Sequence, residues 1–241
     1  MLIPLPNAFG DAVTNMAIDA ALLASMPAGL AAFRHYGWLE PSLSFGYAQR
    51  YNEVAQNSAP ELSLIRRLTG GGIVDHRNDW TYALILHSSL AASKRPATEL
   101  YQQIHQAIQQ TLQSMQIETQ LAPCPKACKS RQPTPNSISS VSQCFVNPAV
   151  NDVLRLDGQK IAGAAMKRSR AGLLIQGSID RSALPEDFDF AHFQPKLLIQ
   201  LSQALELAQG ELEDIRPLFK SEQIQQEKER FASKAWNQKR V

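Results

Sequence analysis

The sequence has few cysteines, little charge imbalance and no long apolar run. Its three cysteines are an odd number, which argues against a disulfide framework and for a reducing compartment. Lys and Arg total 24 against 22 Asp and Glu, so a net charge of +2 offers no electrostatic basis for binding nucleic acid or a membrane. No window approaches the ~20 apolar residues that span a bilayer. The opening MLIPLPNAFGDAV lacks the regions of a signal peptide. We therefore expect a cytoplasmic protein with no nucleic acid or membrane partner.

The chain is long enough for one sizeable core, since 44% of its 241 residues are hydrophobic. Helical spacing of apolar residues predicts helices, and shorter alternating runs bounded by Gly and Pro predict strands. We expect helices over 14–25, 98–116 and 195–209, and strands over 30–36, 41–47, 62–68, 80–87, 151–156, 159–166 and 172–179. Strand-rich middle segments with hairpins and separate helices indicate an α+β fold rather than a doubly wound parallel sheet.

Two segments interrupt this pattern. Residues 123–143 contain four prolines and many serines, so we expect a long loop inside the domain. Residues 221–241 are rich in Gln, Glu and Lys and predict a polar tail or a solvated helix. We accordingly expect one catalytic-size domain over 1–220, followed by this tail.

The segment IRRLTGGGIVDH, residues 65–76, is the strongest local signal. Three consecutive glycines after a strand let the backbone approach a ligand closely, and their N–H groups can hold a carboxylate or a phosphate. A glycine-rich turn with a structural arginine pair is an equally good interpretation of the triplet alone. The segment is neither a P-loop nor a dinucleotide fingerprint, because both need a different spacing.

Two further residues are candidates for chemistry. Lys160, in DGQKIAGAA, stands among small residues and can place its ammonium on a carbonyl oxygen, although an exposed hairpin lysine is the more ordinary interpretation. Cys144 becomes a nucleophile if positive charge lowers its pKa, but most reduced cysteines are small buried hydrophobes. The pair Cys124 and Cys128 lacks the second pair that a structural zinc site needs, so we predict no metal site. No Ser-His-Asp motif is visible.

These pieces together resemble one family. TNMAIDAALL, RHYGW, PSLSFGYAQ, RRLTGGGIVDH, TYALI, CFVNPAVNDV, GQKIAGAA and GLLIQGSI occur in the order found in lipoate–protein ligase A and the octanoyl and lipoyl transferases, over roughly residues 8–185. The resemblance implies the catalytic fold of biotin and lipoate protein ligases, which is related to class II synthetases. That fold has a central, mostly antiparallel or mixed sheet flanked by helices.

The resemblance also implies a site. In the family, the arginine–glycine segment and a lysine hairpin enclose the acyl chain, and the lysine contacts the acyl carbonyl. Carried over by motif, the acyl-binding and ligand-binding residues are Arg66, Arg67, Thr69, Gly70, Gly71, Gly72, His76 and Gly163, with Asn151 and Asp152 matching a pair near the ligase nucleotide site. Cys144 and Lys160 would be the catalytic residues.

Three functions remain open at this stage. A transferase would move an octanoyl or lipoyl group from a carrier thioester through Cys144 to a lysine, without a cofactor. A ligase would use ATP and Mg²⁺ to form lipoyl-AMP, and an inactive relative would only bind acyl groups or carriers. The expected partners are acyl carrier protein and lipoyl-domain proteins, namely glycine cleavage H protein and 2-oxoacid dehydrogenase E2. Two departures from the family pattern are Gln176, where the family has His, and Ala20, where it has Glu.

Overall fold

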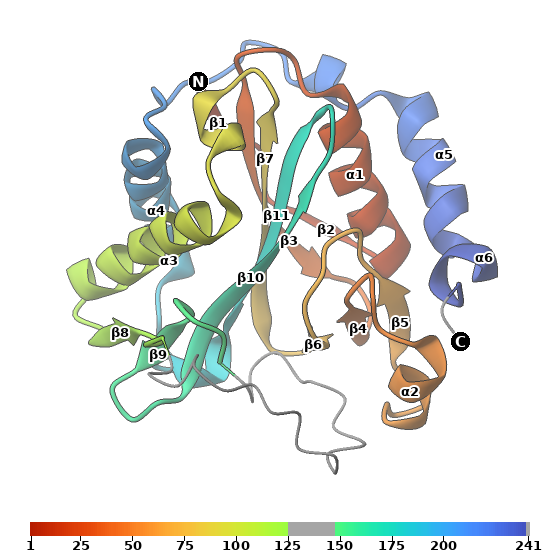
Figure 1. Ribbon diagram of the computed structural model, residues 1–241, viewed down its shortest axis with the longest axis horizontal. Coiled ribbons are helices and arrows are strands. Elements are labelled where there is room, and N and C mark those ends of the chain that lie inside the picture. The colour runs from red at the N-terminus through yellow and green to blue at the C-terminus, as the bar shows by residue number, and fades with distance from the viewer. Residues whose placement is uncertain (125–147, 240–241) are drawn as a thin grey trace.

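The computed structural model describes residues 1–124 and 148–239, which form a sheet with helices on both faces (Figure 1). Its helices are α1 (Ala12–Ser25), α2 (Tyr51–Gln56), α3 (Ala97–Ser114), α4 (Phe190–Leu205), α5 (Ser221–Ala232) and α6 (Lys234–Asn237). Its strands are β1 (Leu2–Pro4), β2 (Ala8–Gly10), β3 (Ala31–Trp38), β4 (Ser42–Phe45), β5 (Ser63–Arg66), β6 (Val74–Asp75), β7 (Asp79–His87), β8 (Thr119–Leu121), β9 (Val153–Arg155), β10 (Lys160–Arg168) and β11 (Gly172–Asp180).

The main sheet of the described residues has eight strands, with the path β1-β3-β7-β11-β10-β9-β8 and β2 beside β3. β1 and β2 pair with β3 in parallel, and the other neighbours are antiparallel. The α+β prediction with a mixed, mostly antiparallel sheet is therefore confirmed. The hairpin predicted at Asp157-Gly158 joins β9 to β10, and Gly158 has the positive φ of +92° that such turns demand.

Alternation along the strands gives the main sheet two apolar faces. One face packs beneath α3 and α4, through residues such as Tyr82, Leu84 and Ile175. The opposite face packs against α1 and the C-terminal helices, through residues such as Ala83 and Ile85. Figure 1 shows α3 and α4 on one side of the sheet and α1, α5 and α6 on the other. The sheet therefore forms the middle layer of the molecule.

A small sheet in the order β5-β4-β6 stands beside α1 and carries the arginine–glycine segment. Residue 46, directly after β4, must be glycine, because a Cβ there would overlap the carbonyl oxygen of Gly71. This close approach fixes the glycine triplet against the end of β4. The small sheet thereby holds the triplet over one face of the main sheet.

The end of the described chain is packed rather than loose. Residues predicted as a polar tail or helix form α5 and α6, and the side chains of Phe231 and Trp236 are buried in the same cluster as α1. The indole N–H of Trp236 donates to the backbone oxygen of Arg66 at 2.9 Å. The two helices therefore brace β5 from outside.

The predicted elements match the structure within a few residues, with one larger difference. The helix expected over 195–209 begins at Phe190, because Asp189 caps it by accepting a hydrogen bond from the N–H of His192. Pro195 then lies inside the helix rather than at its start. Most of the loop predicted over 123–143 falls outside the described residues. None of the helices described is both long and apolar enough to cross a bilayer.

Candidate functional site

A pocket that is partly open to solvent lies between the main sheet and the small sheet, and the space without atoms in it is about 420 Å³ when the open solvent at its mouth is included. Its floor comes from neighbouring strands of the main sheet, namely β10, β11, β7 and β3. Its roof comes from the small sheet and the glycine triplet, and Met16 of α1 closes one side. The lining is Met16, Tyr36, Trp38, Ser44, Arg67, Gly71, Gly72, Val74, His76, Thr81, Gly163, Ala164, Ala165, Gln176, Gly177 and Ser178. Small residues dominate the β10 end, while aromatic rings close the β3 end.

The glycine triplet is held in place by Arg67. The Arg67 guanidinium is buried and donates to the carbonyl oxygens of Gly70 and Gly72 at 2.9 and 2.8 Å. Gly71 has a φ of +85°, which a residue with a side chain rarely adopts. Within residues 1–124 and 148–239, the N–H groups of the three glycines make no backbone hydrogen bond. The triplet thus presents backbone donors next to the pocket, as an oxyanion or carboxylate requires.

Lys160 begins β10 at the edge of this pocket, and its side chain is buried. Its Nζ lies 2.7 Å from Oδ2 of Asp152, whose carboxyl group is fully buried. The N–H of Ala149 donates to the same oxygen at 2.5 Å, and the hydroxyl of Tyr101 donates to Oδ1. A Cβ at position 163 would lie 2.6 Å from the Lys160 Nζ, so a side chain there would displace the ammonium from its present position. Lys160 is therefore buried and ion-paired, so the alternative interpretation of an ordinary exposed hairpin lysine is wrong.

Asn151 and Asp152 differ in their surroundings. Asn151 is half-buried in a turn with a φ of +68°, and its N–H donates to the backbone oxygen of Ala122 at 2.9 Å. This left-handed conformation suits Asn better than most residues. The turn directs the following carboxyl group of Asp152 inward to Lys160.

A second hydrogen-bonded chain crosses the β3 end of the pocket. His76 Nδ1 lies 2.8 Å from Oδ2 of Asp79, and His76 Nε2 lies 2.6 Å from Oγ of Ser44. Because a carboxylate only accepts, Nδ1 of His76 donates to Asp79, while Nε2 faces the Ser44 hydroxyl. Arg67 donates to the same serine oxygen at 2.7 Å, and Trp38 stacks on the His76 ring at 3.9 Å.

The chain Ser44–His76–Asp79 was missed by the sequence analysis, which found no Ser-His-Asp motif. Ser44 is fully buried on β4, and no nucleophile-type turn surrounds it. The oxygen of Asp79 in this chain also accepts from Thr81 and Ser178 on the main sheet. The chain therefore ties the main sheet through Ser44 to Arg67 and the glycine triplet.

Gln176, one of the two departures from the family pattern, lies in the wall of the pocket. Its Oε1 accepts from the Thr69 hydroxyl at 2.9 Å and its Nε2 donates to Asp19 at 2.8 Å. Asp19 also pairs with Arg34 at 2.7 Å. Burial raises the pKa of the Asp19 carboxyl, and the adjacent Arg34 charge partly opposes that effect. The Gln176 amide thus links α1 to the arginine–glycine segment. Ala20, the other departure, is buried in the core.

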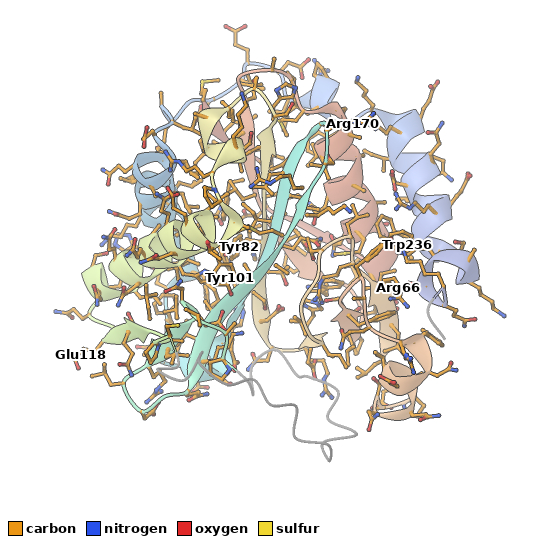
Figure 2. The ribbon with its side chains drawn as sticks, viewed as in Figure 1. Arg66, Tyr82, Tyr101, Glu118, Arg170 and Trp236 are labelled. Carbon is orange, nitrogen blue, oxygen red and sulfur yellow. The ribbon has the colours of Figure 1, made fainter. Side chains whose placement is uncertain are left out.

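Arg66 does not line the pocket. Its guanidinium donates to the backbone oxygens of Tyr47, Gln49 and Asn237, and the ring of Phe45 lies below it. Figure 2 shows Arg66 beside Trp236, on the side of the small sheet that faces α6. The contacts that Arg66 makes with the described residues therefore hold the backbone around β5 in place.

The structure brings together much of the predicted site. Of the predicted residues, Arg67, Gly71, Gly72, His76 and Gly163 line the pocket, while Lys160 and Asp152 form the ion pair at its edge. Gly70 and Thr69 support the roof through Arg67 and Gln176. Cys144 lies outside the described residues. Across the part of the chain that is described, no cluster of three His, Cys, Asp or Glu side chains is arranged to hold a metal.

Tyr101 was not predicted as a site residue. Its only signal in the sequence is a Tyr–His pair at i and i+4, Tyr101 and His105, on the predicted helix over 98–116. The centroids of the two rings lie 4.0 Å apart, with the ring planes tilted by 41°.

Comparison with known proteins identifies the family. The family model of the lipoyl protein ligase A/B catalytic domain matches residues 11–208. The octanoyltransferase LipM of Kyrpidia tusciae is 31% identical over 73% of this chain and 65% of its own length. The octanoyltransferase LipM of Staphylococcus aureus is 33% identical over 80% of this chain and 71% of its own length. The chain thus spans about 65% of the length of the first of these relatives.

The fold agrees with solved structures. A T. acidophilum lipoate protein ligase homologue, solved with bound lipoic acid, superposes with a TM-score of 0.69, at 18% identity, over 99% of this chain and 98% of the other. That likeness establishes the α+β fold of the lipoate ligase catalytic domain. Together with the family match over most of the chain, it shows that this protein belongs to the lipoyl protein ligase A/B catalytic family.

Proposed function

We propose that this protein transfers an octanoyl or lipoyl group from a carrier-bound thioester, through Cys144, to a lysine on a lipoyl-carrier domain. The observation that carries the proposal is the buried Lys160–Asp152 pair at the edge of a pocket roofed by a glycine triplet. Its relatives from K. tusciae and S. aureus are octanoyltransferases, which supports this reaction in particular.

The pocket suits a medium-length acyl chain. Its floor crosses four adjacent strands, and three strand spacings amount to roughly 14 Å. Gly163 and Ala165 leave space near Lys160, and Trp38 and Tyr36 close the far end with ring faces. Burying each methylene is worth about 0.8 kcal/mol, so a chain of this kind gains several kcal/mol from the lining. We place the acyl carbonyl at the Lys160 end and the chain terminus near Trp38.

Lys160 has the character of an electrostatic catalyst. Its ammonium is held by Asp152 in a buried setting, where water does not screen it. A positive charge fixed beside the acyl carbonyl stabilises the oxyanion that forms when a nucleophile attacks. The N–H groups of the glycine triplet supply further donors to the same oxygen.

Cys144 is proposed as the nucleophile from the sequence. Its thiolate attacks the thioester carbonyl, the carrier thiol leaves with a proton, and the acyl group becomes a thioester of Cys144. The neutral amine of the acceptor lysine then attacks this thioester, an amide forms, and the Cys144 thiol is restored. Every bond broken is matched by one formed, so the cycle needs neither ATP nor a metal. We place it in the cytoplasm, where thiols stay reduced.

The proposed partners follow from this chemistry. The donor is an acyl carrier protein or an acylated lipoyl domain. The acceptor is a lysine of a lipoyl domain, such as glycine cleavage H protein or a 2-oxoacid dehydrogenase E2 subunit.

An ATP-dependent ligase is the second candidate. The uninterrupted triplet Gly70–Gly72, with its available N–H groups, favours it because such donors also bind phosphate. In that reaction ATP and Mg²⁺ would activate free lipoate, and Cys144 would take no part.

One assay separates the two. Purified protein is mixed with octanoyl-acyl carrier protein and a lipoyl domain without nucleotide, and in parallel with free lipoate and Mg-ATP. Octanoylation of the domain without nucleotide is the expected result. Modification only in the Mg-ATP mixture would overturn the transferase proposal.

A further inference from the structure

Tyr101 projects from α3 to the underside of β10, next to the ion pair of Lys160 and Asp152. Figure 2 draws Tyr101 and Tyr82 in the same region, where α3 crosses the sheet. Tyr101 itself lies outside the pocket lining. Its hydroxyl nevertheless makes two contacts with the elements that carry the site.

The direction of the two hydrogen bonds follows from their partners. The carboxylate of Asp152 only accepts, so the Tyr101 hydroxyl donates to Oδ1. The same oxygen of Tyr101 accepts the backbone N–H of Ala164 at 3.3 Å. One hydroxyl therefore joins the backbone of β10 to the carboxyl group of Asp152.

Each carboxylate oxygen of Asp152 therefore has its own partner. Oδ1 faces Tyr101, and Oδ2 faces the Lys160 ammonium at 2.7 Å. A carboxyl group held at only one oxygen can rotate about its χ2 angle, which is broad for Asp. With Oδ1 held by Tyr101, the other oxygen points at Lys160, and the N–H of Ala149 also donates to it at 2.5 Å. Strand β10, which carries Lys160, thus also holds Asp152, the counterion of Lys160, through the Ala164 N–H and the Tyr101 hydroxyl.

The Tyr101 hydroxyl keeps its proton, and so can donate to Asp152, at every pH at which the protein would be assayed. Burial, reinforced by the Asp152 charge, holds the pKa of the Tyr101 hydroxyl well above its ordinary value. The hydroxyl consequently stays protonated whenever Asp152 is ionised. The centroid of the Tyr101 ring lies 4.0 Å from that of His105, with the two rings tilted by 41°, and this contact restricts the direction of the Tyr101 ring.

We propose that Tyr101 is a positioning residue that orients Asp152 and, through it, sets where the Lys160 ammonium meets the acyl carbonyl. The inference rests on the proposed function for its kinetic consequence, but not for its effect on Lys160 itself. Tyr101 acts through another residue and does not touch the reacting atoms.

The chain supplies a matched control. Tyr82 is a fully buried tyrosine of the core beneath α3, whereas Tyr101 is partly buried, and the Tyr82 hydroxyl has no hydrogen-bond partner among the described residues. Tyr101→Phe removes a hydroxyl that orients Asp152, whereas Tyr82→Phe removes one that orients nothing. Both variants keep their rings, and near-UV circular dichroism verifies that both are folded at the assay temperature.

The first readout is steady-state octanoyl transfer to a lipoyl domain. We expect Tyr101→Phe to lower kcat by about 10-fold or more, since a displacement of about 1 Å at a reacting group is worth up to about 100-fold. KM for the carrier is expected to change less than about twofold, because Tyr101 lies beneath β10 and outside the pocket lining. Tyr82→Phe should retain the wild-type kcat. Wild-type kcat in folded Tyr101→Phe, or an equal loss in both variants, would overturn the inference.

The second readout needs no acyl transfer. Lysines are labelled briefly with acetic anhydride, and the fraction modified at Lys160 is measured by peptide mass spectrometry against that at an exposed lysine. Release of Asp152 should raise Lys160 labelling at least about threefold in Tyr101→Phe and not in Tyr82→Phe, because side chains that lose a fixed partner become more accessible. If the wild type transfers no octanoyl group, the proposed function is wrong, but the labelling of Lys160 still tests whether Tyr101 orients Asp152. Equal labelling in all three proteins would refute the positioning role.

Discussion

Replacing Lys160 by Met tests whether this lysine serves catalysis or only the fold. The substitution keeps an unbranched side chain but removes the ammonium from Oδ2 of Asp152, where it lies at 2.7 Å. Both side chains are buried, and breaking a buried pair by removing one partner costs roughly 3–5 kcal/mol. Tyr101 and the N–H of Ala149 still donate to Asp152, so we expect a loss near the lower end, about 3 kcal/mol.

The double variant Lys160→Met/Asp152→Asn separates the two roles. It removes both charges, so most of the lost free energy of unfolding should return, leaving a net cost of about 1 kcal/mol. Octanoyl transfer should stay at least about 100-fold below wild type, which is the usual effect of removing an oxyanion-stabilising donor. Urea denaturation gives the free energy of unfolding, and mass spectrometry of the lipoyl domain gives the transfer rate. Recovery of transfer together with stability would refute a catalytic role for Lys160.

Three other measurements address the pocket, a buried histidine and the C-terminal helices. A hexanoyl donor should react about 15-fold less efficiently than an octanoyl donor, because two methylenes are worth about 1.6 kcal/mol; equal kcat/KM values would exclude the pocket as the acyl site. Burial lowers the pKa of His105 to about 4, so the unfolded state binds a proton that the folded state does not, and stability is lost as pH falls from about 6.5 to about 4. His105→Leu should remove roughly 2 kcal/mol of the stability difference between pH 7 and pH 5, and an unchanged difference in urea titrations would contradict this. Trp236→Ala should cost about 3 kcal/mol, because it removes a buried indole and its hydrogen bond to Arg66; a change below about 1 kcal/mol would show that α6 does not brace β5.

Much of the fold was predictable from local pattern. Apolar residues at helical spacing located α3, and the Asp157-Gly158 turn located the hairpin of β9 and β10, because both signals are contained in a few neighbouring residues. The C-terminal helices were harder to predict. Helix α5 has a mostly polar sequence, and only the tertiary contacts of Phe231 and Trp236 turn it into part of the core.

Sequence motifs identified candidate site residues, but the contacts between those residues could not be predicted from the sequence. The glycine triplet and Lys160 could be identified as candidates, yet the burial of Lys160 depends on Asp152 and on the absence of a side chain at Gly163. Arg66 and Arg67 look alike in the sequence, but only Arg67 lines the pocket. Tyr101 and Ser44 were missed because their partners lie 51 and 32 residues away along the chain, where no local spacing relates them.

In the proposed reaction the acyl group passes through Cys144. The most direct test is intact-protein mass spectrometry after mixing the protein with octanoyl-acyl carrier protein in the absence of ATP. We expect an added octanoyl mass on the wild type that disappears in Cys144→Ser and is removed from the wild type when a lipoyl domain is added. An octanoyl adduct that persists in Cys144→Ser, or octanoylation of the lipoyl domain at the wild-type rate by that variant, would contradict it.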